Sequence, residues 1–265
     1  MNAAQAGRTG TAPGPAGRTR ISGTPVPIDP AAVQAFFAGR GCGVSEDHPL
    51  TSVLYQDHDP GLAERRDAHE KQVAMPLLRL AAGFRVLDVG CGIGRWAGPV
   101  LAAGSDYVGV DYSAEVLAVG ARRHPGARFV HASMTGLQQP AVSAQLRDCD
   151  GATGFERIIM VGVLMYANDE DVAAALTGVA ALARPGGIVY LREPTAIRQR
   201  LTLRGHWSEE LGAEYNAIYR TRDELLAAIA VHAPALRVVS DADLYPPELN
   251  NRNETRQRYC MLERT

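Results

Sequence analysis

The stretch RVLDVGCGIG, residues 85–94, decides the fold. It predicts a buried strand with Asp88 near its end, followed by a turn into a helix through Gly90, Gly92 and Gly94. Glycine permits such a tight turn and lets a ligand approach the backbone without a Cβ in the way. The free N–H groups at the start of the helix suit a carboxylate or a phosphate. The stretch therefore indicates a ligand-binding turn; the alternative is a turn with a purely structural role.

Around this turn, short apolar segments alternate with helical ones. The expected strands cover residues 84–89, 107–111, 128–132, 155–163, 188–192, 236–240 and 255–262. Strands that alternate with helices are typical of a parallel sheet covered on both faces. No helical pattern separates the last two strands, and so short a connection joins only antiparallel strands. The sequence therefore predicts an α/β fold with a doubly wound, mostly parallel sheet.

A second acidic residue stands at the end of the strand expected after the glycine turn. Asp111 ends the next expected strand, 17 residues after Gly94. In a doubly wound sheet, ligands bind beyond the carboxyl ends of the strands, and a carboxylate there can accept hydrogen bonds from ribose hydroxyls. The glycine spacing is G-x-G-x-G rather than the G-x-G-x-x-G of dinucleotide sites. Together, the turn and the second acid favour a nucleoside ligand.

Four segments carry a resemblance to a known family. VLDVGCGIGRW (86–96) and YVGVDYS (107–113) resemble the first two motifs of class I S-adenosylmethionine-dependent methyltransferases. FERIIMVGVLMYANDED (155–171) and LARPGGIVYLREP (182–194) resemble the fourth strand of that family and its Pro-Gly-Gly turn with the fifth strand. The resemblance covers roughly residues 60–265. It implies a Rossmann-like sheet of seven strands with an antiparallel last strand, S-adenosylmethionine as cofactor and S-adenosylhomocysteine as product.

The resemblance also assigns roles to residues that would hold the cofactor. The glycines line its methionine part, Asp88 holds its ammonium group, Asp111 binds the ribose and Tyr112 lies against the adenine. The alternative for Tyr112 is a half-buried aromatic ring without a ligand contact. Ser133 and Met134 stand where the family often has an acid. The expected cofactor residues are Asp88, Gly90, Cys91, Gly92, Gly94, Asp111, Tyr112, Ser133, Met134, Val161 and Gly162.

A long connection after the fifth strand predicts the acceptor pocket. Residues 194–220 are too many for a simple turn, and long connections in compact domains tend to be functional. We expect them to form a cap that faces a helical lid from residues 29–83. Most of their charges fit solvated helix faces. The expected acceptor-binding residues are Tyr55, His206, Trp207, Tyr215 and Tyr219.

Two residues end strands where the family places groups that face the acceptor. Tyr166 follows the fourth strand, and Glu193 follows the fifth, directly before Pro194. We expect both to be catalytic, with Glu193 as a general base. The structural alternative is that Glu193 binds backbone N–H groups and that Tyr166 packs on the cofactor.

Composition limits the remaining possibilities. The net charge of −2 and the pI of about 6.4 show no basic excess for nucleic acid. No apolar stretch is long enough for a transmembrane helix. The four cysteines match neither a disulfide framework nor a zinc site, so we expect reduced thiols, no metal and a cytoplasmic monomer or homodimer. The expected domain organisation is a disordered tail over 1–28, a helical lid segment over 29–83 and a cofactor-binding domain over 84–265.

The predicted function is methyl transfer to a nitrogen or oxygen of a small-molecule metabolite, as in natural-product or antibiotic biosynthesis. Two alternatives remain open. The first is C-methylation of an anionic small molecule held by Arg198, Arg200 and Arg204. The second is a nucleoside-binding scaffold protein without catalytic activity. A methyl-transfer assay separates the enzyme from the scaffold, whereas cofactor binding does not.

Overall fold

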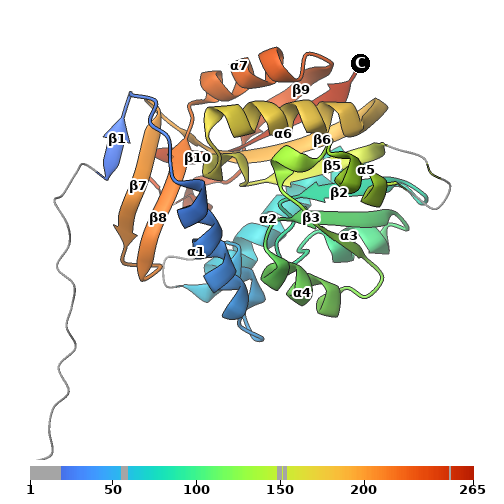
Figure 1. The fold of residues 1–265 in the computed structure, drawn as a ribbon, viewed down its shortest axis with the longest axis horizontal. Helices are drawn as coiled ribbons and strands as arrows, with labels where there is room; N and C mark the ends of the chain where they lie inside the picture. The colour runs from blue at the N-terminus through green and yellow to red at the C-terminus, as the bar shows by residue number, and fades with distance from the viewer. Residues whose placement is uncertain (1–18, 55–58, 148–150, 152–153, 251) are drawn as a thin grey trace, which may run out of the picture.

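A central sheet of seven strands organises the computed structural model, which describes residues 19–54, 59–147, 151, 154–250 and 252–265. Its strand order is β4-β3-β2-β5-β6-β10-β9 (Figure 1). The strands are β2 (Arg85–Val89), β3 (Asp106–Asp111), β4 (Arg128–His131), β5 (Phe155–Val161), β6 (Ala183–Ala196), β9 (Leu236–Asp243) and β10 (Thr255–Arg264). The order reverses between β2 and β5, which is the position expected for a ligand site.

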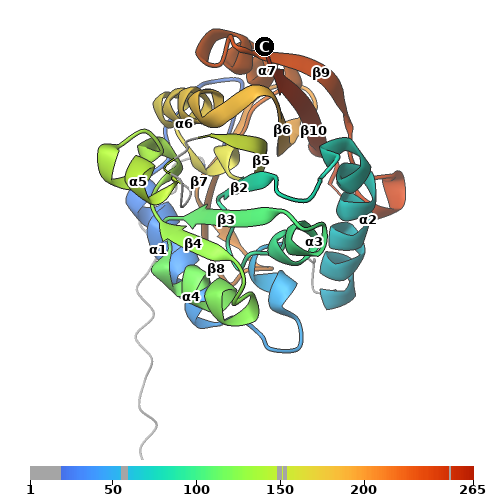
Figure 2. The same ribbon diagram turned by 90° about the vertical axis from the view of Figure 1, so that its right-hand side faces the viewer.

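Helices cover both faces of this sheet, as Figure 2 shows from the side. One face packs on α5 (Pro140–Gln145), α6 (Asp169–Leu182) and α7 (Arg222–His232). The other packs on α2 (Pro60–Leu78), α3 (Ala97–Ala102) and α4 (Ala114–Arg123). Short 3-10 turns are η1 (Pro49–Ser52), η2 (Met134–Gly136), η3 (Leu164–Tyr166) and η4 (Pro247–Leu249). Within these ranges, no helix is both long and apolar enough to cross a bilayer.

The apolar strands explain this three-layer arrangement. Side chains alternate along a strand, so each central strand supplies both faces. Leu87 and Val89 of β2 pack toward α6, whereas Val86 packs toward α2 and α3. All five residues of β2 are buried. Strands buried on both faces are mostly apolar, and the two charged residues of β2, Arg85 and Asp88, are buried with hydrogen-bond partners.

The predicted antiparallel strand is confirmed. β10 lies between β6 and β9 and is antiparallel to both. Its long pairing with β6 extends from Thr255 opposite Ala196 to Glu263 opposite Ile188. β6 is therefore longer than expected: it begins at Ala183 and continues through Glu193 and Pro194 to Ala196.

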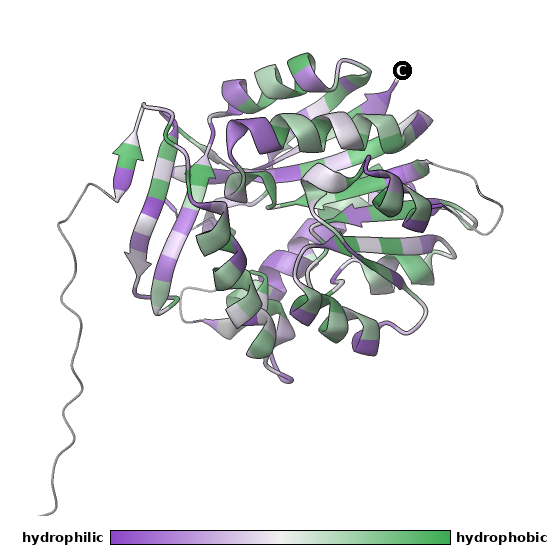
Figure 3. Cartoon of the chain, viewed as in Figure 1, coloured by the Kyte–Doolittle hydropathy of each residue, from purple (hydrophilic) through white to green (hydrophobic). Residues whose placement is uncertain are grey.

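A second sheet corrects two expectations. Residues 194–220 continue β6 and then form a hairpin of β7 (Leu201–Ser208) and β8 (Ala213–Tyr219), not helices. Alternating hydrophilic and hydrophobic bands on β7 and β8 in Figure 3 agree with strands that have one buried face. β1 (Arg20–Ser22) pairs antiparallel with β7, with Ser22 opposite Leu201. The expected tail over 1–28 is therefore wrong for residues 19–28, because strand pairing orders them; residues 1–18 lie outside the described part.

The segment after β1 leads across the molecule to α1 (Pro30–Cys42). Ile28 is buried, and its backbone N–H and C=O both bond the side chain of Asn168, at 2.9 and 3.1 Å. Asp29 caps α1 by accepting the N–H of Ala31 at 2.9 Å. Helix α1 then lies between β8 and α4 (Figure 1). The N-terminal segment thus connects the small sheet to the large one.

Candidate functional site

A cavity of about 740 Å³ lies at the carboxyl ends of the central strands. This volume falls within the roughly 300–1,000 Å³ typical of small-molecule sites. One wall consists of the residues that follow β2, β3, β4 and β5, together with the end of β6. The opposite wall comes from α1, η3, the β7–β8 hairpin and the segment between β9 and β10. Helix α1 and the hairpin close the cavity over the sheet edge.

The glycine turn forms part of the first wall as predicted from its sequence. Gly90 and Gly92 line the cavity and have positive φ values of 70° and 53°. A Cβ on Gly90 would lie 2.4 Å from Val163, and one on Gly92 would lie 2.9 Å from Val53. Cys91, between them, also lines the cavity. Only glycine fits at these two positions without a shift of the opposite side chains.

Asp111 connects the turn to the next helix. One carboxylate oxygen accepts the N–H of Gly92 at 2.9 Å, and the other accepts the N–H of Ser113 at 2.9 Å. Burial raises the pKa of Asp111, and these backbone hydrogen bonds act in the opposite direction. The carboxylate lies on the cavity wall at the end of β3, beside Tyr112. This geometry fits a group that accepts hydrogen bonds from a polyhydroxyl ligand.

The structure places most of the other expected cofactor residues on the same wall. Tyr112 is half-buried and its hydroxyl donates to the carbonyl of Val33 in α1 at 3.4 Å. The remaining expected residues on this wall are Ser133, Met134, Val161 and Gly162. The wall therefore combines residues from four different strand ends.

Asp88 and Gly94 do not line the cavity, in contrast to what the resemblance implies. Asp88 is buried beneath the turn, and its carboxylate accepts a hydrogen bond from the hydroxyl group of Tyr107 at 2.7 Å. Burial raises its pKa to about 7. A Cβ on Gly94 would lie 2.9 Å from the ring of Phe129, so this glycine permits close packing between the turn and β4. Both residues therefore lie in the packing around the turn and not on the cavity lining.

A buried cluster of charges was missed by sequence reasoning. Glu70 of α2 is fully buried and binds Arg95 at 2.6 Å and Arg192 at 3.0 Å. Burial alone would raise its pKa, but the two arginines outweigh this effect and lower the pKa to about 2. Both arginines reach the cavity wall, as do Arg66 and Tyr245. The arginine cluster comprises Arg66, Asp67, Glu70, Lys71, Arg95 and Arg192.

The arginine cluster has a net positive charge, because it contains four cations and two carboxylates. The guanidinium group of Arg66 donates to the carbonyl of Leu249 at 3.0 Å and lies over the ring of Tyr245. Burial raises the pKa of Tyr245 to about 12, so this phenol stays neutral. In the sequence, the hint of this cluster was the run of closely spaced acidic and basic residues over 64–71. Arg95 and Arg192, which bind Glu70, are distant from this run in sequence, so the run alone could not show that the cluster lies at the cavity.

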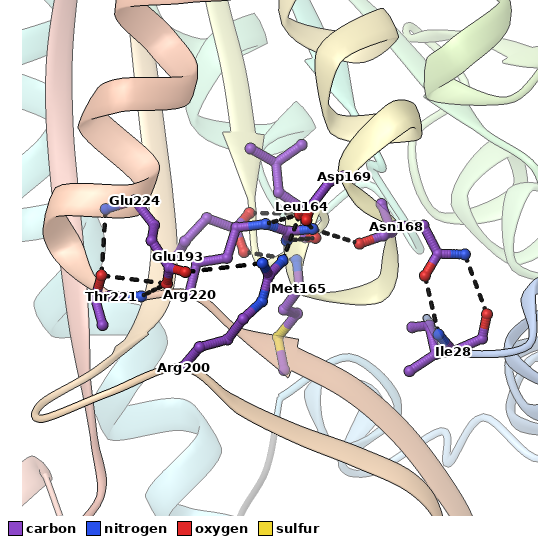
Figure 4. A network of polar contacts seen from close by, with 11 residues as sticks. Ile28, Leu164, Met165, Asn168, Asp169, Glu193, Arg200, Arg220, Thr221 and Glu224 are labelled. Carbon is purple, nitrogen blue, oxygen red and sulfur yellow. Dashed lines mark hydrogen bonds and ion pairs between the residues drawn. The ribbon is translucent and has the colours of Figure 1, made fainter. Parts of the chain in front are cut away.

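Glu193 does not face the cavity, which differs from its expected role as a general base. Its carboxylate is buried and accepts three backbone N–H groups, from Val163 at 2.8 Å, Leu164 at 2.9 Å and Met165 at 3.1 Å (Figure 4). Burial raises the pKa of Glu193, and these hydrogen bonds oppose the rise. Alternation along β6 explains the orientation, since the neighbouring Arg192 and Pro194 line the cavity instead. The structural alternative therefore describes Glu193 best.

Arg220 holds the same segment from its other side (Figure 4). Its guanidinium group donates to the carbonyls of Leu164 at 2.9 Å and Ala167 at 2.8 Å. It also pairs with Asp169, which Arg200 contacts as well. Arg200 is therefore part of a structural network, and Arg198 and Arg204 do not line the cavity either. The three arginines do not form the expected clamp for an anionic acceptor.

The opposite wall carries the aromatic residues expected to bind the acceptor. Tyr166 and Tyr215 line the cavity, with their hydroxyl oxygens 2.9 Å apart. His206 lies directly across from Tyr215 in the hairpin, and its Nδ1 is 3.0 Å from the hydroxyl of Thr19. Burial, together with Arg20, lowers the pKa of His206. Trp207 and Tyr219 also line this wall. Tyr55 lies outside the described residues.

Comparisons with known proteins agree with this geometry. Residues 87–189 match a family model described as a methyltransferase domain. Ubiquinone biosynthesis O-methyltransferase from Rhizobium rhizogenes is 32% identical over 146 residues, which are 54% of this chain and 51% of that protein. The chain spans about half the length of the first curated relatives it matches.

Solved structures share the fold at low sequence identity. Phosphoethanolamine N-methyltransferase 1 from Haemonchus contortus, in complex with phosphoethanolamine and S-adenosylhomocysteine, has a TM-score of 0.65 at 14% identity, over 90% of this chain and 50% of that one. The 1,6-didemethyltoxoflavin-N1-methyltransferase from Burkholderia thailandensis, with its acceptor and S-adenosylhomocysteine bound, has a TM-score of 0.58 at 16% identity. That match covers 96% of this chain and 100% of that one. At these identities the likeness shows a shared fold.

Proposed function

We propose that this chain, which carries a class I S-adenosylmethionine-dependent methyltransferase domain, transfers a methyl group to a nitrogen or oxygen of a small molecule. The cofactor is S-adenosylmethionine. One observation carries the proposal: a single cavity joins the glycine turn and Asp111 to a second wall that is rich in tyrosine. An enzyme that transfers a group between two small molecules needs both parts in one enclosed space.

The residues on the first wall fit the cofactor. Asp111 accepts hydrogen bonds from the ribose hydroxyls, because its carboxylate lies on the wall at the end of β3. Gly90 and Gly92 line the cavity with bare backbone, which lets the ligand approach the turn. The positive charge of the arginine cluster favours the carboxylate of the methionine part. When bound, S-adenosylmethionine supplies a methyl group on a positively charged sulfur.

The protein then has to align the acceptor and accept its proton. Alignment of two bound reactants can contribute up to about 7–11 kcal/mol. Tyr166 and His206 lie on the acceptor wall, and the lowered pKa keeps His206 neutral near pH 7. In the tautomer in which Nδ1–H of His206 donates to the hydroxyl of Thr19, Nε2 is the nitrogen that can accept a proton from the acceptor. Natural-product metabolites remain the acceptors that we propose, because the cavity is built for a small molecule.

The proposal predicts a selective loss of cofactor affinity in Asp111→Asn. The amide cannot accept the same charge-assisted hydrogen bonds, which are worth about 1.5–3 kcal/mol. We expect the dissociation constant for S-adenosylhomocysteine, measured by calorimetry, to rise at least tenfold. Asp106→Asn is the matched control, because Asp106 is exposed at the opposite end of β3. Unchanged affinity in Asp111→Asn would contradict the cofactor site.

Catalysis is tested separately from binding. The purified protein is incubated with S-adenosylmethionine and candidate metabolites, and S-adenosylhomocysteine and methylated product are measured together by mass spectrometry. Equal amounts of both, lost in Asp111→Asn and kept in Asp106→Asn, would support the enzyme. Tight cofactor binding without turnover of any acceptor would instead favour the scaffold protein.

A further inference from the structure

The inner part of the acceptor wall consists of uncharged side chains. Its members come from η3 and both strands of the hairpin, and they pack into one hydrophobic cluster. They are Met165, Tyr166, Leu201, Leu203, Tyr215 and Tyr219. Two phenylalanines of α1 pack on these tyrosines: the rings of Phe37, which also lines the cavity, and Tyr166 are 4.8 Å apart, and those of Phe36 and Tyr215 are 5.7 Å apart. Both pairs meet edge to face, the geometry that aromatic rings favour.

The charged residues of this half include two pairs of opposite sign, and Glu209 lines the cavity beside them. Arg252 binds Glu210 at 2.9 Å, and Arg20 binds Glu254. The side chains of Arg20, Glu254 and Arg252 are each more than 40% exposed. The charges within each of these two pairs cancel, so neither pair attracts an ion. A charged acceptor moved past them would lose its hydration without gaining an opposite charge on the inner wall.

The inner wall does offer hydrogen bonds. The hydroxyl groups of Tyr166 and Tyr215 are 2.9 Å apart, and each phenol oxygen has two acceptor lone pairs besides its own proton. Burial raises the pKa of Tyr219, so this phenol remains protonated at neutral pH. A hydroxyl or N–H group on a ligand can therefore join the Tyr166–Tyr215 pair. The aromatic and leucine side chains around it suit a flat ring.

We propose that the acceptor is an uncharged aromatic compound whose hydroxyl or N–H group bonds to the Tyr166–Tyr215 pair. This inference rests on the proposed function, because it takes the hairpin end of the cavity as the acceptor site. It distinguishes this chain from methyltransferases whose acceptor is a free carboxylate, phosphate or ammonium compound. The hydroxyl pair thus serves as a specificity determinant.

Three ring compounds of similar size and different charge test the proposal. They are 2-naphthol, 2-naphthoate and 2-naphthylmethylammonium, titrated by calorimetry at pH 7 into protein saturated with S-adenosylhomocysteine. We expect 2-naphthol to bind at least tenfold more tightly than either ion. Equal or tighter binding of an ion, or no binding of any of the three, would overturn the proposal.

Variants then locate the binding site. We expect Tyr166→Phe and Tyr215→Phe to weaken 2-naphthol binding at least fivefold and to leave affinity for S-adenosylhomocysteine within twofold. Tyr259→Phe is the control, because Tyr259 lies on β10 away from the cavity wall. Unchanged 2-naphthol affinity in both tyrosine variants would refute the hydroxyl pair as the determinant. Failure of the parent protein to bind S-adenosylhomocysteine would refute the proposed function instead, so the two failures are distinguishable.

Discussion

Glu193 shows how one buried carboxylate can determine the shape of a wall that it does not touch. Its three hydrogen bonds fix the backbone of Val163, Leu164 and Met165, and the next residue is Tyr166 on the acceptor wall. Because a carboxylate accepts several N–H groups at once, it can hold a turn that no single backbone carbonyl could hold. Glu193 is therefore a positioning residue for Tyr166.

This role makes Glu193→Gln informative. The amide keeps one acceptor oxygen but turns an N–H group toward the backbone donors, so the turn after β5 should shift. We expect turnover to fall roughly tenfold, while affinity for S-adenosylhomocysteine stays within threefold and the pH profile keeps its shape. Glu263→Gln, on β10 at the far side of the molecule, is the control. Loss of the acidic limb of the pH profile would mean that Glu193 is a general base after all.

Asp88 predicts a pH dependence of stability. Its pKa is about 7 in the folded protein and 3.8 in a model peptide, so between these values the folded state binds a proton that the unfolded state releases. Stability from this group is therefore present at low pH and falls as the pH rises toward 7. The Asp88→Asn variant would lack this loss, because its amide does not titrate, and Tyr107 can still donate to the amide oxygen.

The measurement compares Asp88→Asn with the parent by urea unfolding at pH 5 and pH 8. At each pH, the free energy of unfolding of the parent is subtracted from that of the variant. We expect this difference to be higher at pH 8 than at pH 5 by roughly 1–4 kcal/mol, since one pKa unit corresponds to about 1.4 kcal/mol. All other groups are common to both proteins and cancel in the difference. A difference that does not change with pH would show that Asp88 is ionised in the folded state throughout this range.

For single residues, the sequence predicted which residues lie at strand ends better than it predicted the direction in which a side chain points. Asp111 ends a strand, and its position alone brings it to the sheet edge. Asp88 and Glu193 lie within strands, where a shift of one residue selects the opposite face. The segment after residue 192 continues as a strand instead of leaving the sheet, so the expected direction of Glu193 was wrong.

At the scale of elements, the segment from β1 to α1 is the part that the sequence described least well. Residues 1–28 contain many small and polar residues, which is typical of a tail. The three residues of β1 become ordered only because β7, about 180 residues later, offers its edge. Pairing over such a distance leaves no local pattern in either segment. The hairpin is different: β7 and β8 are close in sequence and alternate in hydropathy, but their many charges were assigned to solvated helix faces.

A deletion tests how much this segment contributes. Removal of residues 1–28 eliminates β1 and the two hydrogen bonds between Ile28 and Asn168. We expect the melting temperature to fall by several degrees, because each net hydrogen bond contributes about 1 kcal/mol and 1 kcal/mol shifts a protein of this size by roughly 2–4 °C. Removal of residues 1–18 is the control, since it leaves these contacts intact. Equal melting temperatures of the two truncated proteins would show that the segment does not stabilise the fold.

At the scale of the whole molecule, the two halves of the cavity differ in how they are built. The cofactor half comes from consecutive strand–helix units between β2 and β5, and each unit leaves a readable pattern in the sequence. The acceptor half combines α1, the hairpin and the segment before β10, which are far apart along the chain. The sequence therefore predicted the large sheet and its glycine turn, and it named Tyr166, Tyr215 and Tyr219 as facing the acceptor, whereas the structure was needed to show the hairpin and α1 that hold them.

The pairing of β1 with β7 also affects the order in which the protein can be completed during synthesis. Ser22 leaves the ribosome 179 residues before its partner Leu201. At a synthesis rate of about 5–20 residues per second, β7 is made roughly 10–40 s after β1, and only then can the two strands pair. By then β2 to β5 have already been made and can assemble with their helices. The acceptor wall is thus the last part of the cavity to form, and the newborn chain can have a cofactor site before it has a place for the acceptor.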